Sequence, residues 1–208
     1  MIERGKFITL EGGEGAGKST QSKALAEVLK AQGIDCLVTR EPGGSPGAEA
    51  IRALVLEGGD ERWTPRSEAL LFAAARADHL ARTILPALEV GRWVICDRFL
   101  DSSLAYQGGA GGLGIDEVRE INAFAIGGAM PDRTLVLALA EGGARARARD
   151  DMGSDRIGGR DEAYHQKVDL TFRQLVAEEP ERLRLIDASG TPEEVTQRLL
   201  AALSDLLP

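Results

Sequence analysis

Residues 7–19 read FITLEGGEGAGKS, and this segment is the strongest single indication of the fold class. It opens with a short apolar run, Phe7–Leu10, which has the length and composition of a buried β-strand. Gly12–Ser19 then matches the pattern GxxxxGK[ST] in full, and a helix is predicted to begin at Lys18. A glycine-rich loop between a strand and a helix directs backbone N–H groups at phosphate oxygens, and the helix N-terminus adds partial positive charge. The stretch therefore predicts a nucleoside triphosphate site.

Each residue of this loop has an expected part in that site. We expect Lys18 to reach the β- and γ-phosphates and the Ser19 hydroxyl to coordinate Mg²⁺. The alternative is a glycine-rich turn that binds nothing, and the strand before the loop and the helix after it disfavour that alternative. The predicted ATP-binding set is Gly12, Gly13, Glu14, Gly15, Ala16, Gly17, Lys18 and Ser19.

A second apolar run, Trp93–Cys96, ends directly at Asp97 and Arg98. A carboxylate at the carboxyl end of a strand is where a phosphate-loop enzyme holds Mg²⁺. The Arg98 guanidinium offers a bidentate fork to a phosphate group. An ion pair at an exposed strand end is the alternative interpretation. Coupled to the glycine-rich loop, the pair predicts a magnesium and phosphate site.

Short apolar runs alternate with longer helical patterns along the chain, and this alternation predicts an α/β fold with a parallel sheet covered on both faces. Helices are expected from Lys18 to Gly33, over Ser67–Ala87 and over Glu117–Ile126. A final helix is predicted behind Thr191 as N-cap, with Pro192 in its first turn and Glu194 completing a capping box. The five predicted strands are Phe7–Leu10, Cys36–Thr39, Trp93–Cys96, Thr134–Leu139 and Arg182–Ile186.

The chain shows no internal repeat and no interdomain linker, so a single domain over residues 1–208 is expected. Gly108–Gly114 (GGAGGLG) is interpreted as a flexible loop, and residues 145–160 as a small arginine-rich lid.

The overall charge argues against two classes of partner. Lys and Arg number 25 against 33 Asp and Glu, which gives a net charge of −8. This disfavours nonspecific binding to nucleic acid or to a membrane surface, because both need a basic face. No apolar run reaches the length of a membrane span, and no signal peptide is recognised. Cys36 and Cys96 lie in apolar runs without metal-ligand spacing and are predicted to be reduced buried thiols, so a cytoplasmic protein is expected.

The ordered motifs resemble those of bacterial thymidylate kinases over nearly the whole chain. The series TREPGG, DR and AYQGG is far more specific than the phosphate loop alone. The resemblance implies a three-layer P-loop NTPase fold, a homodimer, and phosphoryl transfer from Mg·ATP to dTMP that yields dTDP and ADP. The matching segments are EGGEGAGKST (11–20), TREPGG (39–44), LFAAARADH (71–79), DRF (97–99), SSLAYQGG (102–109) and PDRTLVL (131–137).

The resemblance also implies which residues bind the acceptor base. Phe72 would stack on the thymine ring and Arg76 would hydrogen-bond its exocyclic oxygen, while Ser103 and Gln107 match positions near the base. From spacing alone, Phe72 is better explained as a core residue, and only the resemblance reverses this interpretation.

The acceptor phosphate and sugar have implied partners too. Arg98 and Arg40 lie where the family handles the acceptor side. Tyr106 matches the position beside the sugar, where its ring would crowd a 2′-hydroxyl. Glu14 matches the acidic position that faces the acceptor sugar and the metal. Such a reaction needs cations more than a general base, because the attacking phosphate oxygen is already ionised.

The sequence departs from the family pattern inside the loop and after one strand. Gly15 stands where some members carry an arginine, so a cation is expected from the lid instead. Arg149 and Arg156 are predicted to clamp the transition state, whereas solvated charge is an equally good interpretation of Arg147 and Arg160. Ala138 stands where an aspartate commonly closes the strand.

Two other functions are alternatives to a thymidylate kinase. One is a different phosphate-loop kinase of nucleotides or small metabolites. The other is a nucleotide-dependent regulatory switch, which would not need FAAAR, AYQGG or an arginine-rich lid. No NKxD sequence for guanine selection occurs, which disfavours a GTPase. His79 and His165 have no ligand-spaced partners, so no metal site is predicted there.

Overall fold

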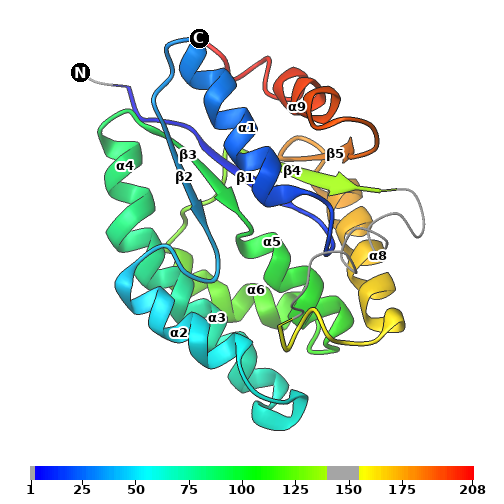
Figure 1. The fold of residues 1–208 in the computed structure, drawn as a ribbon. Coiled ribbons are helices and arrows are strands. Elements are labelled where there is room, and N and C mark those ends of the chain that lie inside the picture. Colours follow the sequence, from blue (N-terminus) through cyan, green and yellow to red (C-terminus); the bar gives the residue numbers. More distant parts are fainter. Residues whose placement is uncertain (1–2, 140–154) are drawn as a thin grey trace.

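Five parallel strands form one sheet at the centre of the computed structural model, which describes residues 3–139 and 155–208 (Figure 1). The strand order is β2-β3-β1-β4-β5, and every neighbouring pair is parallel. The predicted five-stranded parallel sheet is confirmed, and each strand begins and ends within one residue of its predicted bounds. The strands are β1 (Phe7–Glu11), β2 (Cys36–Arg40), β3 (Trp93–Asp97), β4 (Arg133–Ala138) and β5 (Leu183–Asp187).

Helices connect the strands and cover both faces of the sheet (Figure 1). The α-helices in the described ranges are α1 (Lys18–Ala31), α2 (Pro46–Leu56), α3 (Pro65–His79), α4 (Leu85–Glu89), α5 (Leu100–Ser103), α6 (Ile115–Ile126), α8 (Glu162–Glu178) and α9 (Pro192–Ala201). Between them lie the 3₁₀ turn η1 (Asp60–Arg62) and two π-helical segments, η2 (Leu80–Ile84) and η3 (Leu104–Ala110).

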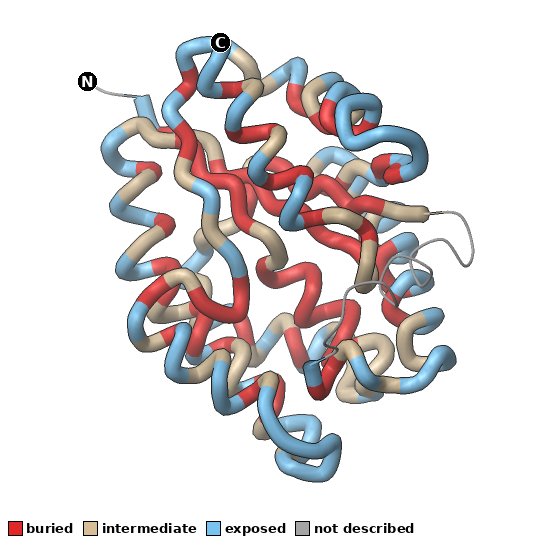
Figure 2. Tube along the Cα trace, in the orientation of Figure 1, coloured by how far each residue is buried: buried red, intermediate tan, exposed pale blue. Residues whose placement is uncertain are grey.

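Two hydrophobic clusters make this a three-layer arrangement. Ile8 and Leu10 of β1 belong to a cluster that also takes in residues of α1 and α9. Phe7 of the same strand points the other way, into a cluster with residues of α4, α6 and α8. Because side chains alternate along a strand, a sheet buried on both faces needs apolar residues at successive positions. Figure 2 shows the resulting band of buried residues through the middle of the molecule.

Local sequence signals explain where several helices begin. α1 starts at Lys18 behind Gly17, whose backbone is left-handed (φ 86°). At α9 the predicted capping box is confirmed, since Thr191 Oγ1 accepts from the Glu194 N–H and Glu194 Oε2 accepts from the Thr191 N–H.

The helix predicted over Ser67–Ala87 is interrupted. α3 ends at His79, the π-helical turn η2 follows, and α4 resumes at Leu85. Pro86 explains the interruption, because a proline inside a helix lacks the N–H and its ring collides with the carbonyl four residues earlier.

The prediction that Gly108–Gly114 is a flexible loop is wrong for its first part. Gly108 and Gly109 belong to η3, and Gly108 is buried. A Cβ at Gly109 would stand 2.1 Å from the Oγ1 atom of Thr171 on α8. Gly109 therefore lets η3 pack closely against α8, while a Cβ at Gly108 would stand 3.1 Å from the Ile115 Cα atom, so both glycines serve close contact.

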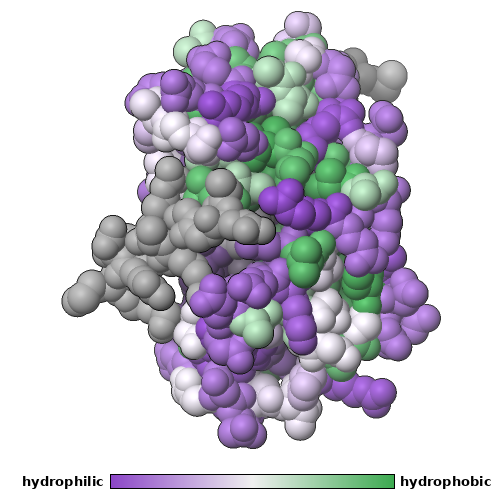
Figure 3. Space-filling view, turned by 90° about the vertical axis from the view of Figure 1, so that its right-hand side faces the viewer, coloured by the Kyte–Doolittle hydropathy of each residue, from purple (hydrophilic) through white to green (hydrophobic). Residues whose placement is uncertain are grey.

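The side of the molecule formed by β5, α8 and α9 is mainly hydrophilic, with hydrophobic residues gathered toward its middle (Figure 3). β5 is an edge strand, and its Leu185 side chain is exposed between charged neighbours such as Arg184 and Asp187. Charged side chains on an edge strand discourage pairing with another sheet. Within residues 3–139 and 155–208, no helix combines the length and the hydropathy that crossing a bilayer requires.

Candidate active site

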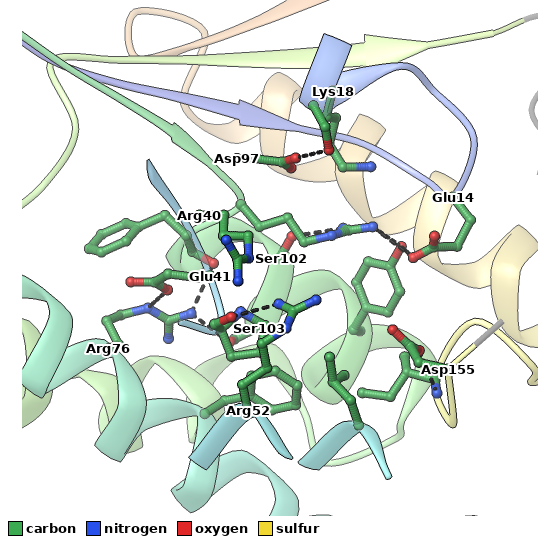
Figure 4. Close-up of a pocket in the computed structure, with 18 of the residues that line it drawn as sticks. Glu14, Lys18, Arg40, Glu41, Arg52, Arg76, Asp97, Ser102, Ser103 and Asp155 are labelled. Carbon is green, nitrogen blue, oxygen red and sulfur yellow. Dashed lines mark hydrogen bonds and ion pairs between the residues drawn. The ribbon is translucent and has the colours of Figure 1, made fainter. Parts of the chain in front are cut away.

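A cavity of about 330 Å³ opens at the carboxyl edge of the sheet, where β1, β2 and β3 end. The strand register sets Asp97 beside Leu10 of β1 on one side and Arg40 of β2 on the other. Figure 4 shows side chains from the phosphate loop, β2, α2 and β3 around this one space. The sequence-predicted residues that line it are Glu14, Gly15, Gly17, Lys18, Ser19, Arg40, Phe72, Arg76, Asp97, Arg98, Ser103, Tyr106 and Gln107.

The Lys18 ammonium group is folded back onto the phosphate loop. Its Nζ atom donates to the carbonyl oxygens of Gly12 at 3.1 Å and Gly13 at 2.7 Å. Burial, followed by repulsion from Arg98, lowers the pKa of Lys18 to about 8. The N-cap of α1, Gly17, supplies no side-chain hydrogen bond to the first turn. The N–H groups at the start of this helix are thus suited to bind an anion.

Ser19 and Asp97 form an oxygen-rich pair on the exposed wall of the cavity. The Ser19 hydroxyl donates to Asp97 Oδ2 at 2.5 Å. A hydroxyl and a carboxylate suit Mg²⁺, which binds few protein oxygens and completes its shell with water and phosphate. In the two described ranges, no group of three or more His, Cys, Asp or Glu side chains could hold a metal ion. The pair therefore fits a magnesium ion that is brought in with a phosphate ligand.

Arg98 is the most constrained residue of the site. It is the only non-glycine residue in the described part of the chain with a positive φ, 70°. Its Nη1 donates to Gly12 O and Ser102 Oγ, each at 3.1 Å, and its Nη2 donates to Glu14 Oε1 at 2.8 Å. Burial alone would lower the pKa of Arg98, but Tyr106 and the acidic neighbours raise it overall. The cation is thus fixed at the floor of the cavity.

Glu14 faces Arg98 in this structure. Beside its ion pair with Arg98, its Oε1 lies 3.5 Å from the Tyr106 hydroxyl. The charge of Arg98, acting against burial and helped by Lys18, lowers the pKa of Glu14. The Tyr106 ring lies under the Arg98 guanidinium, 4.8 Å from its Cζ atom, and the Tyr164 hydroxyl donates to the Tyr106 carbonyl. The predicted contacts of Glu14 with metal and of Tyr106 with sugar stay predictions.

A buried carboxylate that the motif analysis missed supports the turn at Arg98. Glu11, the last residue of β1, accepts from the Phe99 N–H at 2.7 Å and from the Ser102 hydroxyl at 2.5 Å. Burial and the nearby charge of Asp101 raise the pKa of Glu11 to about 7. The available signal was a carboxylate at the end of an otherwise apolar strand, directly before the glycine-rich loop.

The predicted base-binding residues meet at the other end of the cavity, where Phe72 contributes a partly buried ring. Arg76 has an exposed fraction of only 2%. Its Nε donates to Glu41 Oε2 at 2.9 Å, its Nη1 to Asn122 Oδ1, and its Nη2 to Ser103 Oγ at 3.0 Å. Arg76 is therefore a rigid part of the wall, and its predicted hydrogen bond to the base stays a prediction.

Two arginines line the middle of the cavity. Arg40 pairs with Glu49, with an Nη2–Oε1 distance of 3.0 Å. Arg52 of α2 donates from Nη1 to the Pro42 carbonyl at 2.6 Å, and the Glu41–Pro42 peptide is cis. Arg52 was not predicted from the sequence, because this residue belongs to no motif and reaches the cavity only through the packing of α2.

The lid arginines divide into two groups. Arg145, Arg147 and Arg149 lie outside the described residues. Arg156 is described, but its side chain is 0% exposed and does not line the cavity. Its Nε donates to the Val55 carbonyl and its Nη2 to Glu68 Oε2. The prediction that Arg156 clamps the transferred group does not fit this arrangement, in which a buried ion pair holds the guanidinium away from the cavity.

A second cavity of about 320 Å³ adjoins the first. Both cavities are lined by Gly15, Gly17 and Thr20, so they meet at the phosphate loop. The far wall of the second cavity is formed by residues around the start of α9, for which the sequence predicted no part in binding. These residues are Ala188, Gly190, Pro192 and Val195.

Comparisons with known proteins agree on one family. The family model described as thymidylate kinase matches residues 10–199. A thymidylate kinase from Rhizorhabdus wittichii is 61% identical over 206 residues, which cover 98% of this chain and 99% of the relative. One from Bradyrhizobium diazoefficiens is 50% identical over 209 residues, covering 99% and 92%. The crystal structure of thymidylate kinase from Ehrlichia chaffeensis superposes with a TM-score of 0.79 at 30% identity, covering 97% and 99%.

Proposed function

The chain belongs to the thymidylate kinase family and phosphorylates dTMP to dTDP with ATP, and we propose that the cavity at the carboxyl edge of the sheet performs this transfer. The observation that carries the proposal is that Lys18, Arg98 and the Ser19–Asp97 pair all line this one space. They come from the ends of β1 and β3, which lie side by side in the sheet. Such an edge is where open α/β sheets bind their ligands.

The donor phosphates are proposed to lie along the phosphate loop. The N-terminal N–H groups of α1 and the Lys18 ammonium group would bind the β- and γ-phosphates. The second cavity would take the nucleoside of ATP, because it shares the loop residues Gly15 and Gly17 with the first. This proposal adds Ala188, Gly190 and Pro192 to the donor site.

The acceptor phosphate of dTMP is proposed to lie among Arg98, Arg40 and Arg52. Its attacking oxygen is already ionised, so the protein must align two polyanions and offset their repulsion. The fixed fork of Arg98, held by Glu14, would orient the acceptor for in-line attack. A lid cation, Arg149 by sequence position, would add charge at the transferred group.

Mg²⁺ is proposed to bind at Ser19 and Asp97, whose oxygens fit its preference. When bound, the ion supplies positive charge to the phosphate oxygens of ATP. Asp97 would offer the ion a carboxylate oxygen and Ser19 a hydroxyl oxygen. Glu14 is proposed to influence this region through Arg98, because Arg98 is its partner here.

The base and sugar of dTMP are proposed to occupy the end of the cavity that Phe72, Arg76, Ser103, Tyr106 and Gln107 line. The thymine ring would stack on Phe72 and be held in a fixed position against the rigid wall that Arg76 helps to form. Tyr106, packed under Arg98, would leave little room beside the sugar for a 2′-hydroxyl.

We also propose that the protein forms a homodimer and is located in the cytoplasm. Leu70 on α3 and Phe124 on α6 are 57% and 97% exposed, and their two helices pack against each other. We propose that a second copy of this chain covers these two exposed apolar side chains. The two cysteines are buried and unpaired, which agrees with a reducing compartment.

A coupled ADP-release assay with ATP, Mg²⁺ and a panel of monophosphates tests the proposed site. We expect turnover with dTMP well above that with dCMP or dGMP, and loss of turnover in EDTA. Arg98→Ala and Asp97→Ala should each lower kcat/KM for dTMP by roughly 10²-fold or more. Unchanged kinetics in both variants would place the reaction elsewhere in the molecule.

A further inference from the structure

A buried carboxylate, Glu68 on α3, supports the base end of the cavity from behind. Its side chain is 4% exposed, and it is not among the residues that line the cavity. Its Oε1 accepts from the Gln107 amide Nε2 at 3.0 Å. Its Oε2 accepts from Arg156 Nη2 at 2.6 Å and from Arg160 Nη2 at 2.8 Å. Three donors from two distant segments thus meet on one carboxylate.

The contact with Glu68 decides which way the Gln107 carboxamide points. A carboxylate flanked by two guanidinium groups accepts hydrogen bonds and donates none, so the amide nitrogen of Gln107 must face it. The carboxamide oxygen is then the free end of a side chain that lines the cavity and is itself only 3% exposed. No hydrogen bond to this oxygen occurs within residues 3–139 and 155–208. The cavity wall therefore presents an acceptor at this position.

Arg76 offers the complementary donor in the same wall. A guanidinium carries five N–H groups. One, on Nε, is used by Glu41, one on Nη1 by Asn122, and both on Nη2 by the Phe99 carbonyl and the Ser103 hydroxyl. One N–H on Nη1 remains. The wall thus combines a fixed acceptor and a fixed donor.

We propose that Glu68 is a positioning residue for base selection, because it holds the Gln107 oxygen toward the cavity and so requires a ring N–H on the base. The proposal rests on the proposed function, in which dTMP occupies this cavity. Thymine presents a ring N–H donor beside a carbonyl acceptor, which matches the oxygen of Gln107 and the remaining N–H of Arg76. Cytosine presents a ring acceptor beside an amino donor, and it therefore mismatches both groups.

The physical basis of the discrimination is the cost of opposed acceptors. A base whose ring nitrogen accepts would face the Gln107 oxygen across a desolvated contact, with neither lone pair satisfied. Sites built around a specific hydrogen bond reject ligands that cannot complete it. Gln107 alone could relieve the clash by rotating its carboxamide through half a turn. Glu68 prevents that rotation, because the flipped oxygen would face a carboxylate.

The test compares dTMP with dCMP in Glu68→Gln. A glutamine at this position can donate as well as accept, so either orientation of the Gln107 carboxamide becomes possible. We expect the ratio of kcat/KM for dTMP to that for dCMP to fall roughly tenfold or more, with KM for ATP unchanged. In the double variant Glu68→Gln/Gln107→Ala the ratio should equal that of Gln107→Ala alone, because Glu68 acts through Gln107.

Asp101→Asn is the matched control. Asp101 is fully buried and accepts two hydrogen bonds from Arg182, but it does not line the cavity. Its variant should lose stability and keep the dTMP-to-dCMP ratio. If Glu68→Gln lowers kcat/KM for dTMP and for dCMP by the same factor, Glu68 has only a structural role and the proposal is overturned.

Two further measurements test the proposal even if the Glu68→Gln variant does not fold. Glu68→Asp keeps a negative charge near Arg156 and Arg160 but withdraws the carboxylate from Gln107, so the ratio should fall in a folded protein. The parent protein should also reject dTMP methylated at the ring nitrogen, and equal use of that analogue would refute the proposal. Parent protein that phosphorylates no dTMP at all would contradict the proposed function first, and these outcomes are therefore distinguishable.

Discussion

At the scale of single residues, the site depends on a strained turn that buried polar groups hold in place. Arg98 adopts a left-handed backbone, which costs a non-glycine residue about 1–3 kcal/mol. The conformation persists because the Arg98 N–H donates to the Leu10 carbonyl and because Glu11 accepts from Phe99 and Ser102. The left-handed backbone directs the Arg98 guanidinium back over the end of β1, where it donates hydrogen bonds to Gly12 and Glu14.

Glu11→Gln should change how stability depends on pH. The folded-state pKa of Glu11 is raised to about 7 by burial and Asp101, from an ordinary value of 4.5. Its contribution to stability is therefore complete below about pH 4.5 and is lost as pH rises through about 7. Glutamine does not ionise, so between pH 5 and 8 the free energy of unfolding of the variant should rise relative to the parent by roughly 1–3 kcal/mol. Urea unfolding at several pH values measures this difference, and a difference independent of pH would contradict the expectation.

Lys18 should take up a proton when ATP binds. In the free protein its pKa is lowered to about 8, so near this pH part of the population is neutral. The negative charge of a bound triphosphate raises the pKa of Lys18 again, because an opposite charge favours the ammonium form. Calorimetric titration near pH 8, in buffers with different ionisation enthalpies, should reveal proton uptake. The uptake should shrink at about pH 7, where Lys18 is already charged; equal values at the two pH values would argue against this assignment.

At the scale of elements, the described end of the predicted lid, residues 155–160, is tied to α3. Arg156 and Arg160 both pair with Glu68, and the Arg156 N–H donates to the Leu56 carbonyl at the end of α2. Asp155 and Ile157 line the cavity on either side of the buried Arg156. The segment thereby closes one wall of the site while its arginine points into the protein interior.

Arg149→Ala and Arg156→Ala should therefore differ in their effects. Arg149→Ala should lower kcat by roughly 10³-fold or more, as loss of a transition-state cation does, with little change in Tm. Arg156→Ala removes one partner of a buried ion pair and should lower the free energy of unfolding by about 3–5 kcal/mol. Steady-state kinetics and thermal unfolding of both variants provide the comparison. Parent-like turnover in both would refute the assignment of a clamp to this stretch, and parent-like stability of Arg156→Ala would contradict its buried role.

At the scale of the whole molecule, the parallel sheet gathers chemistry from distant parts of the chain. β1, β2 and β3 end at one edge, so the phosphate loop, the TREPGG turn and the Asp97–Arg98 pair share a cavity. The helices on the α3 side of the sheet contribute the side chains, such as Phe72 and Arg76, that line the proposed base-binding end of that cavity. The same helices, α3 and α6, carry the exposed Leu70 and Phe124.

Leu70→Ser and Phe124→Ser should weaken the proposed homodimer. Each removes a large exposed apolar side chain from α3 or α6 and should raise the dimer dissociation constant roughly tenfold or more. Analytical ultracentrifugation over a range of concentrations measures this change. Leu170→Ser on α8, which is also exposed, is the matched control and should leave the dimer intact. A parent protein that sediments as a monomer at every concentration would remove the basis for the proposal.

The sheet, the phosphate loop and most of the residues around the main cavity were predictable from the amino-acid sequence alone. These features are local: apolar runs mark strands buried on both faces, and the spacing from Gly12 to Ser19 sets the anion loop. The family motifs added Phe72, Arg76 and Gln107, which do line the cavity. All of these could be read without knowing which helix packs on which.

The partners of the buried charges, by contrast, depend on how the helices and strands pack in three dimensions. Glu68 meets Gln107 and Arg156 across 39 and 88 residues of chain, and Arg52 reaches the cavity through the packing of α2. The need for a glycine at position 109 also comes from packing, because a side chain there would collide with Thr171 on α8. Contacts between distant segments leave no periodic signal in a single sequence, since they depend on how whole elements pack rather than on the spacing of neighbouring residues.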